Sequence, residues 1–244
     1  MNIAMDFLEE AKNEPVKRVH RATRIDKGKV RLTKRDLFLV GWIGEQYAVR
    51  FDQLQILMAR NSEKAEGETV SFSNVARSVR KWQSLGLVEW SKPFYGKDNP
   101  SWVWSTQEGL RLTNLDFKYQ SPSLTMLNHH FWVNRVRLYR EAKYADEIWI
   151  PERKLRAQND GRQEHYPDAE VVKNNGSRIA IEVELSRKSV ARQGKILDFF
   201  ETVLLDGIKK FNAIVYYCSE ETHEQVSRAM QGRQNFYLRP LTEV

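Results

Sequence analysis

Three acidic residues and a lysine in the segment HYPDAEVVKNNGSRIAIEVELSRKS, residues 165–189, are of the types that cleave phosphodiesters. The acids are Asp168, Glu182 and Glu184, and the lysine is Lys188. Carboxylate oxygens are the ligands that Mg²⁺ and Mn²⁺ prefer. A metal held in this way activates water and stabilises the charge that develops on a phosphoryl group. This chemistry requires a fold that brings the acids together.

A β-hairpin with the turn sequence Asn-Asn-Gly could bring the acids together. A two-residue turn would put Asp168 and Glu182 on opposite faces of the hairpin. A three-residue turn, with Gly176 in a left-handed conformation, pairs Lys173 with Ser177 and, counting back, Asp168 with Glu182. The type of turn therefore decides whether a site can form.

The hydrophobic pattern favours the three-residue turn, because a slip of one residue would mix apolar and charged side chains on both faces. In this register one face carries only the apolar residues Ala169, Val171, Ile179, Ile181, Val183 and Leu185. The other face carries Asp168, Glu170, Ala180, Glu182 and Glu184. Opposed carboxylates repel each other, and a divalent cation would offset that repulsion. Asp168 and Glu182 are therefore the predicted metal ligands.

Regular elements predicted on both sides of the hairpin complete an α/β domain. They are a helix over residues 127–143, a strand over 147–151, a charged loop over 152–165, a helix over 195–207, a strand over 211–218 and a strand or tail near 235–241. His129 and His130 point about 100° apart on the first helix, so we interpret them as hydrogen-bonded packing or surface histidines. Cys218, the one cysteine, lies in an apolar strand and is expected to be a buried, unreactive thiol.

Three helices and a hairpin are predicted in the N-terminal half. Thr33 and Asp36 have the spacing of a capping box at the start of the first helix. Apolar residues at helical spacing follow in three groups: Leu37, Val40 and Ile43; then Leu54, Leu57 and Met58 in a helix over 51–60; then Val75, Val79, Trp82 and Leu85 in a helix capped by Ser71 or Ser73. Gly86 would end the third helix in a left-handed conformation. Strands over 87–90 and 101–106 enclose a turn, and a short helix begins at 106.

The third helix has a polar face that suits nucleic acid. It carries Asn74, Arg77, Arg80 and Lys81, and the tip of the following hairpin adds Lys92 and Lys97. Asn and Arg can bond to base edges, and Lys suits phosphate. The alternative is that this face contacts a protein.

A basic segment precedes these helices. Residues 16–35 contain nine Lys or Arg residues and one Asp, and the whole chain has a formal net charge of +7. The segment is either a solvated linker or a second contact with nucleic acid. The single cysteine suits a reducing compartment. With no apolar run of membrane-spanning length and an acidic N-terminus unlike a secretory signal, the sequence predicts a cytoplasmic protein without membrane contact.

Two resemblances to known families follow from these motifs. The stretch VRKWQSLGLVEW, a hairpin and STQEGLRL resemble the third helix and wing of bacterial winged-helix proteins. Pro167-Asp168, the hairpin and the stretch IEVE resemble the core of PD-(D/E)xK nucleases. Glu184 stands where that family has its lysine, and Lys188 is the nearest substitute. The resemblance also implies an assisting acid on the upstream helix, for which Glu141 is the candidate.

The layout as a whole, from residue 30 onwards, is similar to the replication-relaxation family of plasmids and integrative elements, with EVELSRKS as the most specific string. The resemblance implies an α+β chain: a basic segment at 1–32, a winged helix at 33–120 and a restriction-endonuclease-like mixed sheet at 124–244. The function it implies is double-stranded DNA binding in replication, relaxation or transfer, with Mg²⁺- or Mn²⁺-dependent nicking by Asp168, Glu182, Glu184 and Lys188. The alternative is a non-catalytic accessory factor or transcriptional regulator. Winged-helix proteins often dimerise, so a homodimer stays open beside a monomer.

Overall fold

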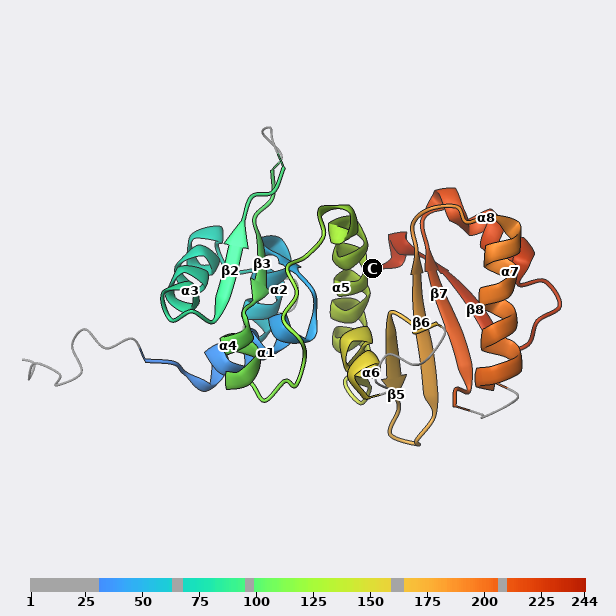
Figure 1. The fold of residues 1–244 in the computed structure, drawn as a ribbon, viewed down its shortest axis with the longest axis horizontal. Coiled ribbons are helices and arrows are strands. Elements are labelled where there is room, and N and C mark those ends of the chain that lie inside the picture. Colours follow the sequence, from blue (N-terminus) through green and yellow to red (C-terminus); the bar gives the residue numbers. More distant parts are fainter. Residues whose placement is uncertain (1–30, 63–67, 95–98, 159–164, 206–209) are drawn as a thin grey trace, which may run out of the picture. The chain divides into compact units, whose positions relative to one another are not determined.

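The computed structural model describes residues 31–62, 68–94, 99–158, 165–205 and 210–244, with the backbone alone for 203–205. Within these ranges the chain forms eight α-helices and two β-sheets (Figure 1). The predicted α+β class is therefore confirmed at this level. Residues Leu32–Val244 form one compact unit, to which Met1–Arg31 does not belong. The predicted basic segment lies mostly outside the described residues.

The compact unit begins with three helices, α1 (Lys34–Glu45), α2 (Phe51–Arg60) and α3 (Phe72–Ser84). The predicted capping box is present, because Thr33 Oγ1 accepts from Asp36 N at 3.2 Å and Thr33 N donates to Asp36 Oδ2 at 2.7 Å. Ser71 caps α3. The apolar residues predicted to face the core in α2 and α3 are buried, except that Leu85 is partly buried. In α1 the prediction was wrong for Leu37, which is 39% exposed, while Leu39 is buried.

A three-stranded antiparallel sheet packs with these helices. Its strands are β1 (Val49–Arg50), β2 (Val88–Ser91) and β3 (Trp102–Ser105), in the order β1-β3-β2. β2 and β3 form the predicted hairpin, and Gly86 has the predicted left-handed conformation with φ +70°. The two residues of β1 are too few to produce an alternating pattern that sequence reasoning could detect.

α4 (Gln107–Leu112) is held against the end of α3 by a close backbone approach. Thr106 Oγ1 accepts from Gly109 N at 3.1 Å and donates to Gly86 O at 2.6 Å. A Cβ atom on Gly109 would lie 2.1 Å from the Leu87 carbonyl oxygen. Only glycine fits at this position without moving the backbone.

The second sheet contains five strands in the order β4-β5-β6-β7-β8. They are β4 (Ile148–Pro151), β5 (Ala169–Val172), β6 (Arg178–Glu184), β7 (Ala213–Cys218) and β8 (Phe236–Pro240). β4, β5 and β6 pair antiparallel, and β6, β7 and β8 pair parallel. Parallel neighbours need a crossover connection. The helices α7 (Val190–Phe199) and α8 (Glu220–Ala229) lie in these two crossovers (Figure 1).

The order of helix, strand, hairpin, helix and strand agrees with the prediction, but two helices were not expected. α6 (Glu152–Gln158) occupies the start of the predicted charged loop. It buries only Arg153 and Leu155, so its apolar periodicity is weak. α8 lies in a segment to which the sequence assigned no element. α7 starts earlier than predicted and continues as a π-helical segment, Phe200–Leu205.

The hairpin of β5 and β6 has the predicted register. Ala169 pairs with Ile181, Lys173 N donates to Ser177 O at 2.9 Å, and Gly176 has φ +79°. The apolar face packs on residues of α5 (Leu127–Lys143), including Val133 and Val136. The opposite face of the sheet, including Ala180 and Tyr216, packs on Leu197 and Phe200 of the α7 crossover. The acid-bearing face is therefore a covered face of the sheet.

α5 also contacts the first part of the compact unit, which comprises α1 to α4 and the three-stranded sheet. Asn134 Nδ2 donates to Ala48 O at 2.8 Å, and Leu138 belongs to the apolar cluster of α1, α2 and α3. Glu141 accepts from Trp42 Nε1 at 3.2 Å and pairs with Arg137. Glu141 thus binds α1 and α5 side chains, and the structure gives no support to its prediction as an assisting acid.

Asp36 joins α1 to α3 in addition to capping α1. Its side chain is almost fully buried, and it accepts from Trp82 Nε1 at 2.8 Å and from Lys81 Nζ at 2.7 Å. Burial alone would raise the pKa of Asp36. The bonds from Lys81, Thr33 and Trp82 outweigh burial and lower this pKa from 3.8 to about 2.

We expect Asp36→Ala to lower the free energy of unfolding by about 2–4 kcal/mol, because it removes a helix cap and leaves buried donors unpaired. Urea denaturation at pH 7 measures this loss. Because the pKa of Asp36 is lower in the folded state, its ionised carboxylate stabilises the fold above pH 3.8, and this stabilisation is lost as the pH falls toward 2. The difference in unfolding free energy between variant and wild type should therefore shrink over this range. Asp116→Ala, at an exposed position, is the control. An equal loss in both variants would contradict the assigned role.

Candidate active site

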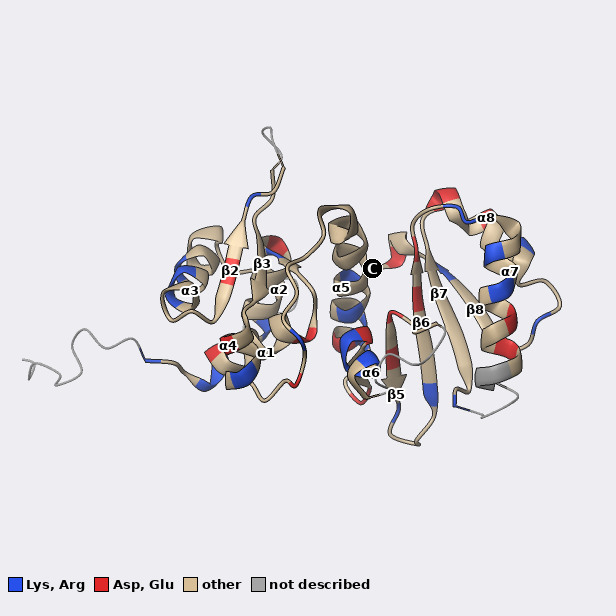
Figure 2. Ribbon diagram, viewed as in Figure 1, with Lys and Arg blue, Asp and Glu red and all other residues tan. Residues whose placement is uncertain are grey.

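The acids predicted to do chemistry lie on or beside the middle strand of the second sheet. Glu182 and Glu184 belong to β6 and share one face, because side chains alternate along a strand. Asp168 directly precedes β5, and its Oδ2 accepts from Val183 N at 2.7 Å. Figure 2 shows acidic residues on β5 and β6 in the interior of the sheet. The hairpin therefore brings Asp168 beside Glu182, as the sequence predicted.

Each of these two carboxylates has a histidine partner. His129 Nε2 lies 2.7 Å from Asp168 Oδ1, and His165 Nε2 lies 3.0 Å from Glu182 Oε1. His129 lies on α5 and is hydrogen-bonded, as the sequence predicted. Its partner, however, is one of the candidate site acids, Asp168. Sequence reasoning missed both pairs. The position of His165 three residues before Asp168 was the one available signal.

The two carboxylates experience opposite electrostatic effects. Burial would raise the pKa of Asp168, but the charge and hydrogen bond of His129 and the Val183 N–H lower it. Burial raises the pKa of Glu182, and the charge of Asp168 raises it further against the effect of His165. Asp168 therefore loses its proton at a lower pH than Glu182 does. Carboxyl groups separated in this way can take different roles in proton transfer.

Lys188 lies in the same electrostatic cluster. Its Nζ forms an ion pair with Glu184, whose side chain is buried. Burial lowers the pKa of Lys188, while the charges of Glu182 and Asp168 act in the opposite direction. The structure thus brings Lys188 to the acids although it stands four positions after Glu184. Glu184 is the partner of this lysine.

A small polar cavity adjoins the Asp168 side of the site. It has a volume of about 20 Å³, and its wall includes His129, Glu152 and Asp168. This volume is large enough for one water molecule. Burial and the charge of Asp168 raise the pKa of Glu152, which pairs with Arg156 at 2.6 Å.

Asp168 and Glu182 supply carboxylate oxygens, which are the donor type that a hard divalent ion prefers. In the described residues no three His, Cys, Asp or Glu side chains form a metal-binding group. Mg²⁺ does not need such a group, because it commonly uses one or two carboxylates plus water and substrate phosphates. Tyr216 pairs in register with Glu182, and its buried hydroxyl has no hydrogen-bond partner within the described ranges. Asp168 and Glu182 would hold the ion in place of their contacts with His129 and His165.

The predicted DNA-contacting residues differ in their exposure. Asn74, Arg77 and Arg80 are exposed on α3, and Lys92 is exposed after β2. Lys81 is partly buried and is held by Asp36. Lys97 lies outside the described residues. The exposed surface of α3 therefore includes the asparagine and the two arginines, and Figure 2 shows the basic residues of this helix.

Comparisons of the chain with family models, curated proteins and solved structures found no match. Within the described ranges, no helix is both long enough and apolar enough to cross a membrane.

We expect His129→Gln to destabilise the fold by about 1–3 kcal/mol below pH 6.5, because it leaves the buried Asp168 carboxylate without its cationic partner. Burial would lower the pKa of His129, but Asp168, Glu182 and Glu152 raise it above 6.5. Because the pKa of His129 is higher in the folded state, its protonated ring stabilises the fold below pH 6.5. This stabilisation disappears as the pH rises through the pKa of the folded state. Urea denaturation at pH 5.5 and 8.5 should show a larger loss at pH 5.5.

His223→Gln on α8 is the control for the preceding experiment. A loss in His129→Gln that is equal at both pH values would contradict the ion pair with Asp168.

Proposed function

We propose that this chain binds duplex DNA by inserting α3 into the major groove. The observation that carries the proposal is the exposed row Asn74, Arg77 and Arg80 on a helix whose opposite face, Val75, Val79 and Trp82, is fully buried. A buried face fixes the helix rigidly, and the exposed face has side chains that can bond to adenine and guanine edges.

The arrangement of the surrounding elements supports this proposal. The order α1, β1, α2, α3, β2, β3 and the sheet order β1-β3-β2 are those of a winged helix-turn-helix domain. In such domains the third helix is the recognition helix. Lys92, at the end of β2, would contact the phosphate backbone from the wing.

The second sheet supports a nuclease-like assignment in the same way. A PD-(D/E)xK core is expected to contain a helix, three antiparallel strands, a crossover helix and a parallel strand. Apart from α6, which lies between β4 and β5, the elements α5, β4, β5, β6, α7 and β7 follow this order. The similarity of EVELSRKS to replication-relaxation proteins leads us to propose that the DNA is that of a plasmid or integrative element.

Metal-dependent cleavage of the bound DNA is the second candidate function. The observation that favours it is the cluster of Asp168, Glu182 and Lys188, in which the two carboxyl pKa values are shifted in opposite directions. Mg²⁺ or Mn²⁺, when bound, would supply Lewis acidity and activate water. Asp168 and Glu182 would hold the ion, and Lys188 would stabilise negative charge on the phosphoryl oxygens. Without cleavage, the chain would be an accessory DNA-binding factor.

For DNA binding, we expect Arg77→Ala with Arg80→Ala to weaken affinity for a duplex by at least tenfold, since each base-edge contact contributes about 1–3 kcal/mol. Fluorescence anisotropy over a salt series measures both the affinity and the number of phosphate contacts. Arg111→Ala on α4 is the control, because Arg111 is also exposed and basic. Unchanged affinity in the α3 double variant would contradict the proposal.

For cleavage, we expect wild-type protein to nick supercoiled plasmid with Mg²⁺ or Mn²⁺ and not with EDTA. Asp168→Asn should reduce nicking by at least a hundredfold, because the amide oxygen lacks the negative charge with which the carboxylate would bind the cation. Glu220→Gln, at an exposed position at the start of α8, should leave nicking unchanged. Duplex binding without cleavage by wild-type protein would reject this candidate and favour the accessory factor.

A further inference from the structure

A groove lies between the start of α7 and the side of α8. It has a volume of about 460 Å³, and its wall includes Arg187, Lys188, Val190 and Gln193 on one side and Glu224, Gln225 and Arg228 on the other. Lys188 belongs both to this groove and to the cluster around Asp168 and Glu182. The groove therefore adjoins the candidate active site.

The start of α7 has unpaired backbone donors, and its first residue, Val190, lines this groove. Ser189 caps the helix: its Oγ accepts from Arg192 N at 3.3 Å, and its carbonyl accepts from Gln193 N at 2.9 Å. The N–H groups of Val190 and Ala191 remain without an acceptor inside the helix. Such groups, together with the helix dipole, attract anions.

A buried side chain in the groove wall also lacks a partner. Gln193 is 2% exposed, and its Nε2 has no hydrogen-bond partner in the part of the chain that the structure describes. Leaving a buried donor unpaired is unfavourable. An acceptor oxygen entering the groove would remove this cost. Gln193 is an indication of a ligand that does not depend on the helix terminus.

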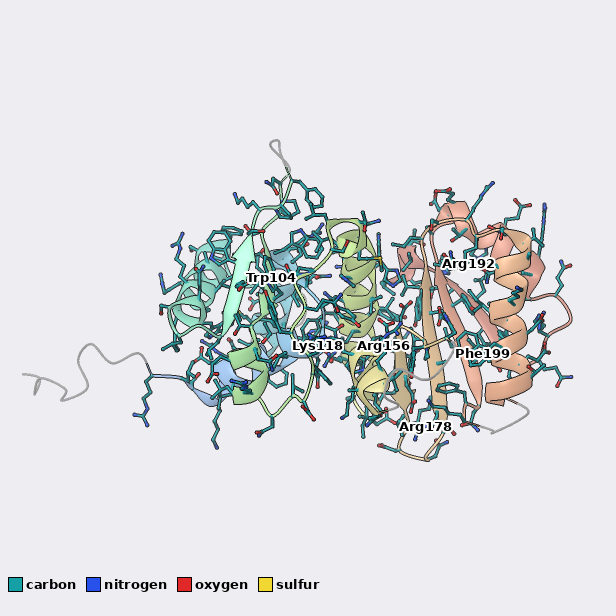
Figure 3. All side chains as sticks on the ribbon, in the orientation of Figure 1. Trp104, Lys118, Arg156, Arg178, Arg192 and Phe199 are labelled. Carbon is teal, nitrogen blue, oxygen red and sulfur yellow. The ribbon has the colours of Figure 1, made fainter. Side chains whose placement is uncertain are left out.

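The charges around the groove favour an anion. Arg228 is paired with Glu224, and Lys188 is paired with Glu184. Arg187 and Arg192 are exposed and have no carboxylate partner among the described residues. Figure 2 shows basic residues on the first half of α7, and Figure 3 labels Arg192 there. Val190 is 82% exposed and adds an apolar surface suited to a sugar or base.

We propose that this groove binds a phosphate of a DNA strand, with Arg187, Arg192 and the first N–H groups of α7 as donors. The strand would continue past Lys188 toward Asp168 and Glu182. This inference rests on the proposed DNA-binding function, and it adds a strand-positioning site distinct from α3.

The test uses the full chain carrying Arg77→Ala and Arg80→Ala, which removes the proposed α3 contacts. Fluorescein-labelled (dT)8 is titrated by anisotropy between 50 and 200 mM NaCl. Adding Arg187→Ala and Arg192→Ala should weaken binding at least fivefold and reduce the salt slope by about 0.7 for each lost phosphate contact. Arg111→Ala added instead is the control. Gln193→Glu, which replaces the donor by an acceptor of the same shape, should also weaken binding.

Thermal unfolding shows whether each variant is folded. If Gln193→Glu is unstable, the substitutions at the exposed residues Arg187 and Arg192 still test the proposal. The proposal is overturned if the four-substitution variant binds (dT)8 as tightly as its parent, or if the parent does not bind at 50 mM NaCl. Titration with dTMP separates a strand site from a mononucleotide site, and equal affinities for dTMP and (dT)8 would also reject the proposal. Duplex binding by wild-type protein is measured separately, so a failure of α3 is distinguishable from a failure of the groove.

Discussion

The register of β5 on β6 is the constraint on which the second half of the molecule depends. It is set by the three-residue turn in which Gly176 has φ +79°. A side chain other than glycine or asparagine is disfavoured at such an angle. Because side chains alternate along a strand, this one turn directs the apolar residues of β6 toward α5, and it places Glu182 and Glu184 on the opposite face of that strand. A shift of one residue would remove both the core and the site.

Burial of the acids then determines what the surrounding elements must supply. A buried carboxylate needs a counter-charge or hydrogen-bond donors. α5 supplies His129 to Asp168, the segment before β5 supplies His165 to Glu182, and the segment before α7 supplies Lys188 to Glu184. One distant helix and two segments that flank the hairpin thus meet at the acids for one electrostatic reason. The same contacts leave Asp168 and Glu182 with pKa values shifted in opposite directions.

The first part of the compact unit depends on a different set of buried polar contacts. Asp36 joins α1 to α3. Asn134 donates to the carbonyl of Ala48, shortly after α1, and Arg153 donates to the carbonyl of Gly44, in the last turn of α1. Such contacts are directional, so they orient the helices more strictly than apolar packing does. Lys81 is held by Asp36, so it is less available for the proposed contact with DNA than Asn74, Arg77 and Arg80. The helix that presents the proposed DNA-reading face is thus fixed from its buried side.

The sequence by itself determined the elements whose signals are local. The capping box of Thr33 and Asp36, the apolar stripes of α2 and α3, the left-handed glycines 86 and 176 and the hairpin register all depend on neighbouring residues, and each is as predicted. The tertiary structure alone decided the histidine partners of Asp168 and Glu182. His129 is far from Asp168 along the chain, and no local pattern relates them. α6 buries too few apolar residues to show a period, and the groove at α7 exists only because parallel pairing of β6, β7 and β8 places α8 beside α7. Local rules fix the strands and helices, but long-range packing decides which polar groups are buried together.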